Sequence, residues 1–177
     1  MSRLCLIGLH GAGKSTVGQL LAEQGYWHIS IGALRRLARM GMQPSDISVR
    51  LMARLREADP GRPLPDDVAA AVVELAMARP RVVLDGLPSS PSHLVLLDSS
   101  WRIVLVQASD KQRRDRLRQR AVVSRRAWTA GGMSARDLQL ESVLQAAGVR
   151  IERFDNDRDL NACREDAAIL SSRTNVR

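Results

Sequence analysis

The chain has 177 residues, 45% of them hydrophobic, so it is long enough to bury one core, and we expect one domain over residues 1–177. No apolar stretch reaches 18 residues and the first apolar run is too short for a signal peptide, so we expect a soluble, cytoplasmic protein without membrane spans. Lys and Arg outnumber Asp and Glu by 27 to 19, which gives a formal net charge of +8. That charge suits nucleic acid, a small anionic substrate or an arginine-rich proteome, but 3% aromatic content argues against stacking on single-stranded nucleic acid.

Short runs rich in β-branched residues alternate with segments whose apolar residues recur at helical spacing. The expected strands are Arg3–Gly8, Tyr26–Ser30, Arg81–Asp85, Arg102–Gln107 and Val149–Phe154. The expected helices are Lys14–Gln24, Gly32–Met40, Ile47–Glu57, Asp66–Ala78, Lys111–Val123, Ala135–Ala146 and Leu160–Leu170. This alternation predicts a three-layer, doubly wound α/β domain with a five-stranded parallel sheet.

The turn after the first expected strand, GLHGAGKS, has the phosphate-binding pattern G-x-x-x-x-G-K-[ST]. In this pattern, backbone N–H groups face phosphate oxygens, the lysine reaches the β- and γ-phosphates, and the serine binds Mg²⁺. We therefore expect ATP and Mg²⁺ as cofactors, with His10 as a variable position in the loop and not a base. The residues expected to hold ATP are Gly8, Gly11, Ala12, Gly13, Lys14, Ser15 and Thr16.

Asp85 ends the third expected strand, directly after an apolar run. Ligands of open α/β sheets collect at the carboxyl ends of the strands. Asp85 is therefore placed like the acidic residue of phosphate-loop enzymes that holds Mg²⁺, and we predict a metal site formed by Ser15 and Asp85.

Four segments together resemble the adenylate kinase branch of the nucleoside monophosphate kinases over nearly the whole chain. They are GLHGAGKST at 8–16, HISIGALR at 28–35, LPDD at 64–67 with VLDGLP at 83–88, and DRLRQR at 115–120. The resemblance implies a P-loop kinase fold with a monophosphate-binding insert at about 30–65 and a short lid at about 121–135. It also implies that Arg35 grips the acceptor phosphate and that Arg116 packs on the donor base.

The same resemblance, with the positive charge that phosphoryl transfer requires, predicts the remaining site residues. Those expected to act in transfer are Lys14, Arg120, Arg125, Arg126 and Arg136. Those expected to contact the acceptor are Ser30, Gly32, Arg35, Arg39, Gly86 and His93. Arg113, by contrast, is expected to be a solvated residue of its helix.

The sequence departs from the family pattern on the acceptor side. Ser89 stands where the family has an arginine, and His93 stands where the family has the glutamine that reads adenine. We therefore expect ATP-dependent transfer to a nucleoside monophosphate, with AMP as the first candidate, and we keep two alternatives. One is a P-loop kinase with another acceptor, of the dephospho-coenzyme A, shikimate or sugar type; the other is a regulatory nucleotide-binding module without transfer. The expected partners are small nucleotides, and a monomer is the expected state.

Overall fold

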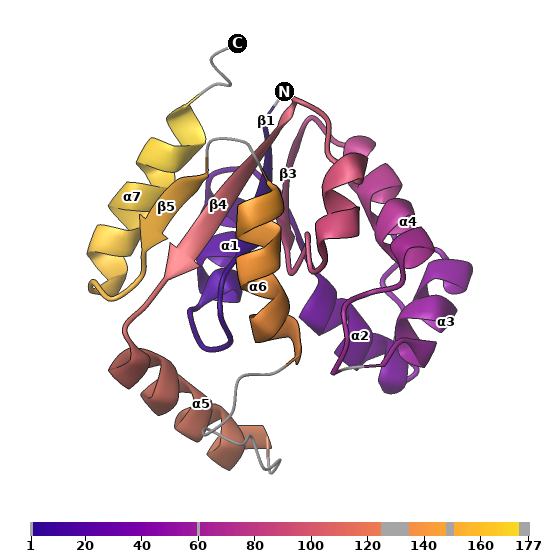
Figure 1. The fold of residues 1–177 in the computed structure, drawn as a ribbon, viewed down its shortest axis with the longest axis horizontal. Coiled ribbons are helices and arrows are strands. Elements are labelled where there is room, and N and C mark those ends of the chain that lie inside the picture. Colours follow the sequence, from indigo (N-terminus) through magenta and orange to yellow (C-terminus); the bar gives the residue numbers. More distant parts are fainter. Residues whose placement is uncertain (1, 60, 125–134, 148–150, 174–177) are drawn as a thin grey trace.

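The computed structural model describes residues 2–59, 61–124, 135–147 and 151–173, with the backbone alone for 123–124 and 135–136. Five parallel strands form one sheet in the order β2-β3-β1-β4-β5 (Figure 1). The strands are β1 (Ser2–Ile7), β2 (Trp27–Ser30), β3 (Arg81–Asp85), β4 (Trp101–Gln107) and β5 (Glu152–Asp155). The predicted five-stranded, parallel α/β fold is thus confirmed.

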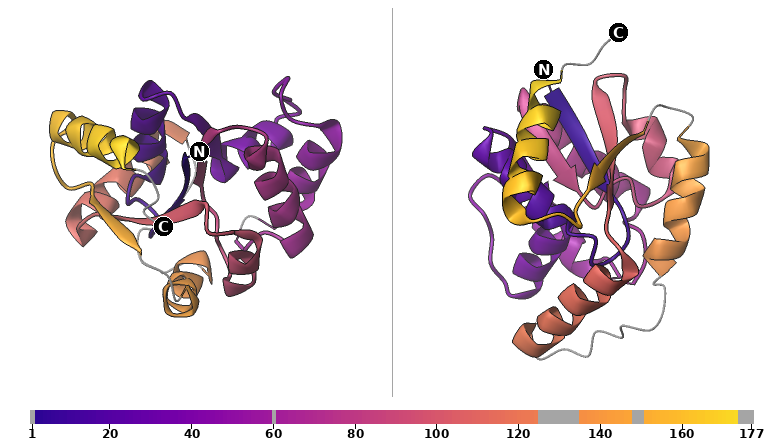
Figure 2. Two further views of the ribbon diagram at one scale, coloured as in Figure 1. Left: turned by 90° about the horizontal axis from the view of Figure 1, so that it is seen from above. Right: turned by 90° about the vertical axis from the view of Figure 1, so that its left-hand side faces the viewer.

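Seven α-helices and one short 3-10 helix surround the sheet within the described residues. The α-helices are α1 (Lys14–Glu23), α2 (Ile31–Arg39), α3 (Val49–Glu57), α4 (Asp66–Met77), α5 (Asp110–Ser124), α6 (Ala135–Ala146) and α7 (Leu160–Ser172), and the 3-10 helix is η1 (Pro91–Leu96). Helices α1 and α7 pack together on one face, and α4, η1 and α6 cover the other (Figure 2). Helices α2 and α3 pack against each other beside the β2 edge, and α5 extends away from the body (Figure 1).

The central strand β1 explains why the chain needs helices on both faces. Leu4 and Leu6 belong to one buried cluster, with residues of α1 and α7, while Cys5 and Ile7 belong to the other, with residues of α4 and α6. Side chains alternate across a strand, so a strand apolar at every position must be covered on both sides. Burial raises the pKa of the Cys5 thiol far above its ordinary range, so this thiol stays protonated as a small core residue.

At the majority of helix and strand ends, the observed bound differs from the predicted one by one or two residues. The prediction that β1 includes Gly8 is wrong, because Gly8 has a φ of 148° and already belongs to the phosphate loop. The helix η1 was not predicted, since a six-residue segment gives no helical period. The predicted fifth strand began at Val149, but β5 begins at Glu152, and residues 148–150 lie outside the described part of the chain.

The parallel sheet brings the carboxyl ends of β1, β2 and β3 to one edge. The loop to α1, the start of α2 and the turn after β3 therefore meet there. Within the described residues, none of the helices is both long and apolar enough to cross a membrane.

Candidate functional site

The phosphate loop joins β1 to α1 and is shaped by glycine at two close approaches. Gly13 precedes the helix with a φ of 90°, and a Cβ there would lie 2.0 Å from Nδ2 of Asn156. A Cβ on Gly8 would lie 2.4 Å from the carbonyl oxygen of Val106 on β4. Neither position accepts a side chain, because both residues have a positive φ and a Cβ would meet the Val106 backbone or the hydrogen-bonded Asn156 amide.

Lys14, the first residue of α1, folds back along this loop. Its ammonium Nζ donates to the carbonyl oxygen of Gly8 at 2.6 Å and to that of Leu9 at 3.1 Å. These two bonds fix the ammonium over the loop, where the N-terminus of α1 also contributes positive potential. The loop thus presents a fixed positive charge, as its sequence pattern predicts.

Asp85 collects hydroxyl groups from two other elements at the end of β3. Its Oδ2 accepts a hydrogen bond from Ser15 Oγ at 2.5 Å and another from Ser30 Oγ at 3.0 Å. Ser30 also caps α2, since its Oγ accepts from the N–H of Ala33 at 3.4 Å. A buried carboxylate beside the loop serine thus lies at the mouth of the phosphate loop.

This donor set suits magnesium. Mg²⁺ prefers oxygen ligands, keeps several waters, and is bound by one or two protein groups together with substrate phosphates. Ser15 can give its proton to Asp85 and still offer oxygen lone pairs to a cation. Ser15 and Asp85 are therefore the residues that would hold Mg²⁺. The described residues contain no group of three or more His, Cys, Asp or Glu arranged for a metal.

His28 lies beside this carboxylate on β2. Its Nε2 is 3.9 Å from Asp85 Oδ2 and its side chain is largely buried. Burial lowers the pKa of His28 below its ordinary value, and the Asp85 carboxylate acts in the opposite direction.

His10 is tied to both helices that flank residues 125–134. Its backbone N–H donates to Asp137 Oδ1 at 2.9 Å and its ring Nδ1 lies 3.1 Å from Asp137 Oδ2, while Arg113 Nε donates to its carbonyl oxygen at 2.9 Å. The expectation that Arg113 is a solvated residue is wrong, because its guanidinium is mostly buried against the loop.

Arg116 and Asn156 hold the other side of the loop. Arg116 Nη1 donates to the carbonyl oxygen of Ala12 at 3.2 Å, and its Nη2 donates to that of Asn156 at 2.6 Å. The amide of Asn156 donates to the same Ala12 carbonyl at 2.7 Å. Arg116 therefore supports the phosphate loop, which was not predicted. Its contact with the donor base stays a prediction.

A cavity of about 330 Å³ opens beside Ser15, between α1, β2 and α2. Its polar lining residues are Ser15, Gln19, His28, Ser30, Arg36 and Asp46. Arg36 folds back along α2, since a Cβ on Gly32 would lie 3.6 Å from its Nη1. The cavity therefore combines a guanidinium and a carboxylate near the predicted metal site.

The structure does not bring Arg35 to this cavity. Its side chain is 3% exposed, and its Nη2 donates to the carbonyl oxygen of Ala58 at 2.6 Å, after the end of α3. Adjacent helical residues point about 100° apart, so Arg36 and not Arg35 lines this cavity, and the contact of Arg35 with an acceptor phosphate stays a prediction. Arg39 is exposed at the end of α2 and does not line the cavity.

His93 also has a structural position. It is 1% exposed; its Nδ1 accepts from the N–H of Ser89 at 3.2 Å, and its Nε2 donates to the carbonyl oxygen of Leu64 at 3.1 Å. Ser89 Oγ accepts from the N–H of Leu64 at 3.3 Å. The prediction that His93 reads the acceptor base does not match this geometry, since both ring nitrogens join the turn after β3 to the loop before α4.

The other predicted site residues lie on different elements or outside the described residues. Gly86 follows β3 with a φ of 102°, Thr16 is exposed in the first turn of α1, and Arg120 is exposed on α5. Arg125 and Arg126 lie outside the described residues, as does the side chain of Arg136. Of the predicted lid, 121–124 belong to α5 and Ala135 begins α6, while 125–134 are not described.

Sequence reasoning missed several residues of this site. Asp137, Arg113 and His28 had signals that were too common to select them: one arginine among many, or one acid in a first helical turn. Gly18 is a more specific signal in the sequence. A glycine inside a helix is unfavourable, and here it makes room for the ring of His28.

Comparison with known proteins agrees with this geometry. Residues 4–142 match the family described as "AAA domain", and the chain belongs to that family. The adenylate kinase of Gloeobacter violaceus is 30% identical over 128 residues, which cover 65% of this chain and 56% of the relative. Adenylate kinase 1 of a Nostoc species is 33% identical over 99 residues, covering 55% of this chain and 53% of the relative.

The chain therefore spans about half the length of the curated relatives it matches. A crystal structure of a gluconokinase from Sinorhizobium meliloti shares the fold, with a TM-score of 0.54 at 21% identity over 96% of this chain and 93% of the other. The predicted resemblance to adenylate kinases and the predicted P-loop kinase fold are both confirmed. The chain is thus similar to adenylate kinases in sequence and to a gluconokinase in fold.

Proposed function

We propose that the protein transfers the γ-phosphoryl group of Mg²⁺-ATP to a small anionic acceptor of the nucleoside monophosphate type. The observation that carries this proposal is the 2.5 Å bond from Ser15 to Asp85 at the mouth of the phosphate loop. It joins the serine at the start of α1 to the carboxylate at the end of β3, and these are the protein oxygens that a magnesium–phosphate complex needs.

Phosphoryl transfer needs positioning and positive charge more than covalent chemistry by the protein. Lys14, whose ammonium is held at the Gly8 carbonyl, would contact the β- and γ-phosphates of bound ATP, and the loop N–H groups would align the phosphate chain. Mg²⁺ held by Ser15 and Asp85 would neutralise charge that develops on the phosphate oxygens. Arg113, Arg116 and the side chains of Asp137 and Asn156 keep the loop in one conformation, so little reorganisation is needed.

The acceptor would lie in the cavity beside Ser15. Arg36 provides a guanidinium for an acceptor phosphate, and Asp46 provides a carboxylate for a hydroxyl or amino group of the same molecule. A nucleoside monophosphate carries both kinds of group. Arg120, Arg125, Arg126 and Arg136 remain proposed donors of positive charge to the transferring group.

The test is a transfer assay with labelled ATP and Mg²⁺ against AMP, GMP, CMP and UMP, together with gluconate, shikimate and dephospho-coenzyme A. We expect at least one monophosphate to be phosphorylated. Arg36→Ala should raise the KM of that acceptor about ten- to a hundredfold, because a charge-assisted contact contributes about 1.5–3 kcal/mol. Arg39→Ala is the matched control and should change this KM by less than about threefold, because Arg39 does not line the cavity.

If only a compound with a hydroxyl acceptor is phosphorylated, the acceptor is not a nucleoside monophosphate. Tight ATP binding without transfer to any compound would favour the regulatory module instead. An unchanged KM in Arg36→Ala would remove this cavity as the acceptor site.

A further inference from the structure

His28 is a largely buried histidine whose Nε2 faces the predicted metal site. It belongs to β2, two residues before Ser30, and lines the same cavity as Ser15. Its Nε2 is buried and makes no hydrogen bond within the described part of the chain, although it lies 3.9 Å from Asp85 Oδ2. A buried ring nitrogen without a hydrogen bond is costly, so its place beside a carboxylate calls for an explanation.

The helix facing His28 is built to admit the ring. A Cβ on Gly18 would lie 2.3 Å from His28 Nε2, 2.6 Å from Cε1 and 2.7 Å from Cδ2. Gly18 is buried in the interior of α1, three residues after Ser15, so both lie on the same side of the helix. Glycine there costs about 1 kcal/mol relative to alanine, and the space it leaves is taken by the imidazole.

The separation from Asp85 is too long for a direct hydrogen bond. Polar groups beyond about 3.5 Å commonly meet through a water molecule. Magnesium sites keep several metal-bound waters, and groups behind the ligands orient those waters and the carboxylate. Asp85 already accepts from Ser15 and Ser30 on the same oxygen, so His28 is the third group directed at it.

We propose that His28 is a positioning residue of the magnesium site, whose Nε2–H donates to a water of the metal's hydration shell and thereby orients Asp85. This inference rests on the proposed function, because it assigns His28 to the cation that accompanies the nucleotide. Gly18 is then the residue that makes the arrangement possible.

The experiment measures Mn²⁺ binding to the protein–ADP complex by electron paramagnetic resonance, which needs no turnover. His28→Phe keeps a ring of similar size without a donor and should weaken Mn²⁺ binding about tenfold or more, as expected for a group behind a metal ligand. His28→Gln, which restores an N–H donor, should stay within about threefold of the parent. Tyr26→Phe is the control, because it removes a ring hydroxyl that bonds Ser2 just before β2 and does not line the cavity, and it should leave Mn²⁺ affinity unchanged.

A second readout separates this role from simple packing. ADP affinity in EDTA should be the same in the parent and all variants, since the proposed role requires the metal. Should His28→Phe prove unfolded in a melting curve, the smaller His28→Leu takes the same test. Equal Mn²⁺ affinity in the parent and in His28→Phe, or in its replacement His28→Leu, would overturn the proposal. A loss of ADP affinity in EDTA as large as the loss of Mn²⁺ affinity would also overturn it.

Failure of the parent itself to bind Mn²⁺ with ADP would contradict the proposed function and not this inference alone. A change confined to the acceptor KM would also overturn the inference, and would assign His28 to the acceptor.

Discussion

Two neighbouring arginines, Arg35 and Arg36, show how strongly position decides the role of one residue type. Arg35 is buried and donates to the Ala58 carbonyl, so it ties α2 to the end of α3. Arg36, one position later, is exposed and lines the cavity beside Ser15. Identical side chains thus serve the fold in one case and the candidate site in the other.

We predict that Arg35→Leu lowers the free energy of unfolding by about 1.5–3 kcal/mol, because it removes a charge-assisted hydrogen bond to a buried carbonyl. Arg36→Leu should change that free energy by less than about 0.5 kcal/mol, as is usual at exposed positions. Urea unfolding followed by circular dichroism measures both. A stable Arg35→Leu protein with impaired acceptor binding would restore Arg35 to the site.

At the scale of elements, the edge strand β5 pairs with β4 along the backbone and also through the side chains of Arg102 and Glu152. Arg102 Nε donates to Glu152 Oε1 at 2.6 Å and its Nη2 donates to Oε2 at 2.8 Å, while its Nη1 donates to the carbonyl oxygen of Leu170 on α7. Arg173 Nη1 also lies 3.5 Å from Glu152 Oε2. The pair therefore joins β4, β5 and α7, and β5 leads directly to Asn156 behind the phosphate loop.

This pair predicts a pH-dependent stability. The hydrogen bonds from Arg102 hold the pKa of Glu152 below its ordinary value of about 4.5. A lowered carboxyl pKa stabilises the fold above the unfolded-state pKa, and that contribution is lost as the pH falls through the folded-state pKa. Glu152→Gln should thus be less stable than the parent by about 1 kcal/mol at pH 7, and the difference should shrink progressively below about pH 4.5.

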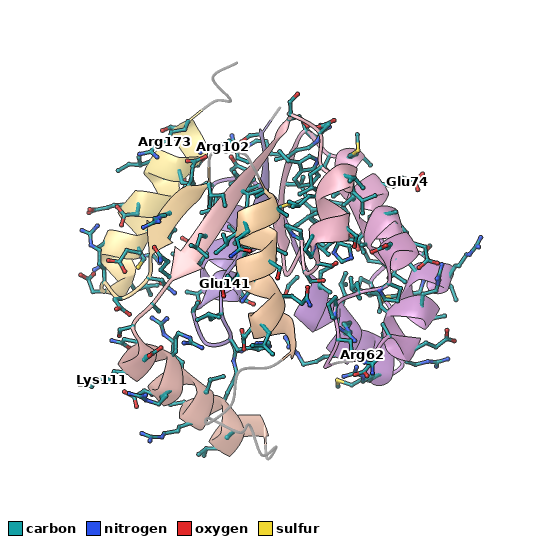
Figure 3. All side chains as sticks on the ribbon, viewed as in Figure 1. Arg62, Glu74, Arg102, Lys111, Glu141 and Arg173 are labelled. Carbon is teal, nitrogen blue, oxygen red and sulfur yellow. The ribbon has the colours of Figure 1, made fainter. Side chains whose placement is uncertain are left out.

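Urea unfolding at pH 7 and at successive values down to pH 3 measures this difference. Glu141→Gln, which changes an exposed glutamate of α6, is the control and should differ little from the parent at any pH (Figure 3). A stability difference for Glu152→Gln that is independent of pH would contradict the assignment.

At the scale of the whole molecule, the fold could be predicted because its signals are local. Apolar runs, helical periods and the GLHGAGKS turn each act within a dozen residues, and their order along the chain determines a parallel sheet. Ser15 and Asp85 could be paired for the same reason, since both follow strand ends. Their 2.5 Å contact agrees with that expectation.

The acceptor side could not be predicted in the same way. Whether Arg35 or Arg36 faces the cavity depends on the exact start of α2, and a one-residue difference turns a side chain by about 100°. The hydrogen bonds of His10 with Asp137 and Arg113 join residues more than a hundred positions apart, and no residue spacing in the sequence indicates them.

The most direct test of the account is transfer of the γ-phosphoryl group of ATP by the parent and by Lys14→Ala, with Mg²⁺ and the best acceptor of the panel. Lys14 contributes charge at the phosphates and donates to two loop carbonyls instead of packing in the core, so its loss should not unfold the protein. The account predicts Mg²⁺-dependent transfer by the parent and a loss of at least about a hundredfold in Lys14→Ala at nearly unchanged melting temperature. Equal turnover in the two proteins, or transfer by the parent that is indifferent to EDTA, would contradict it.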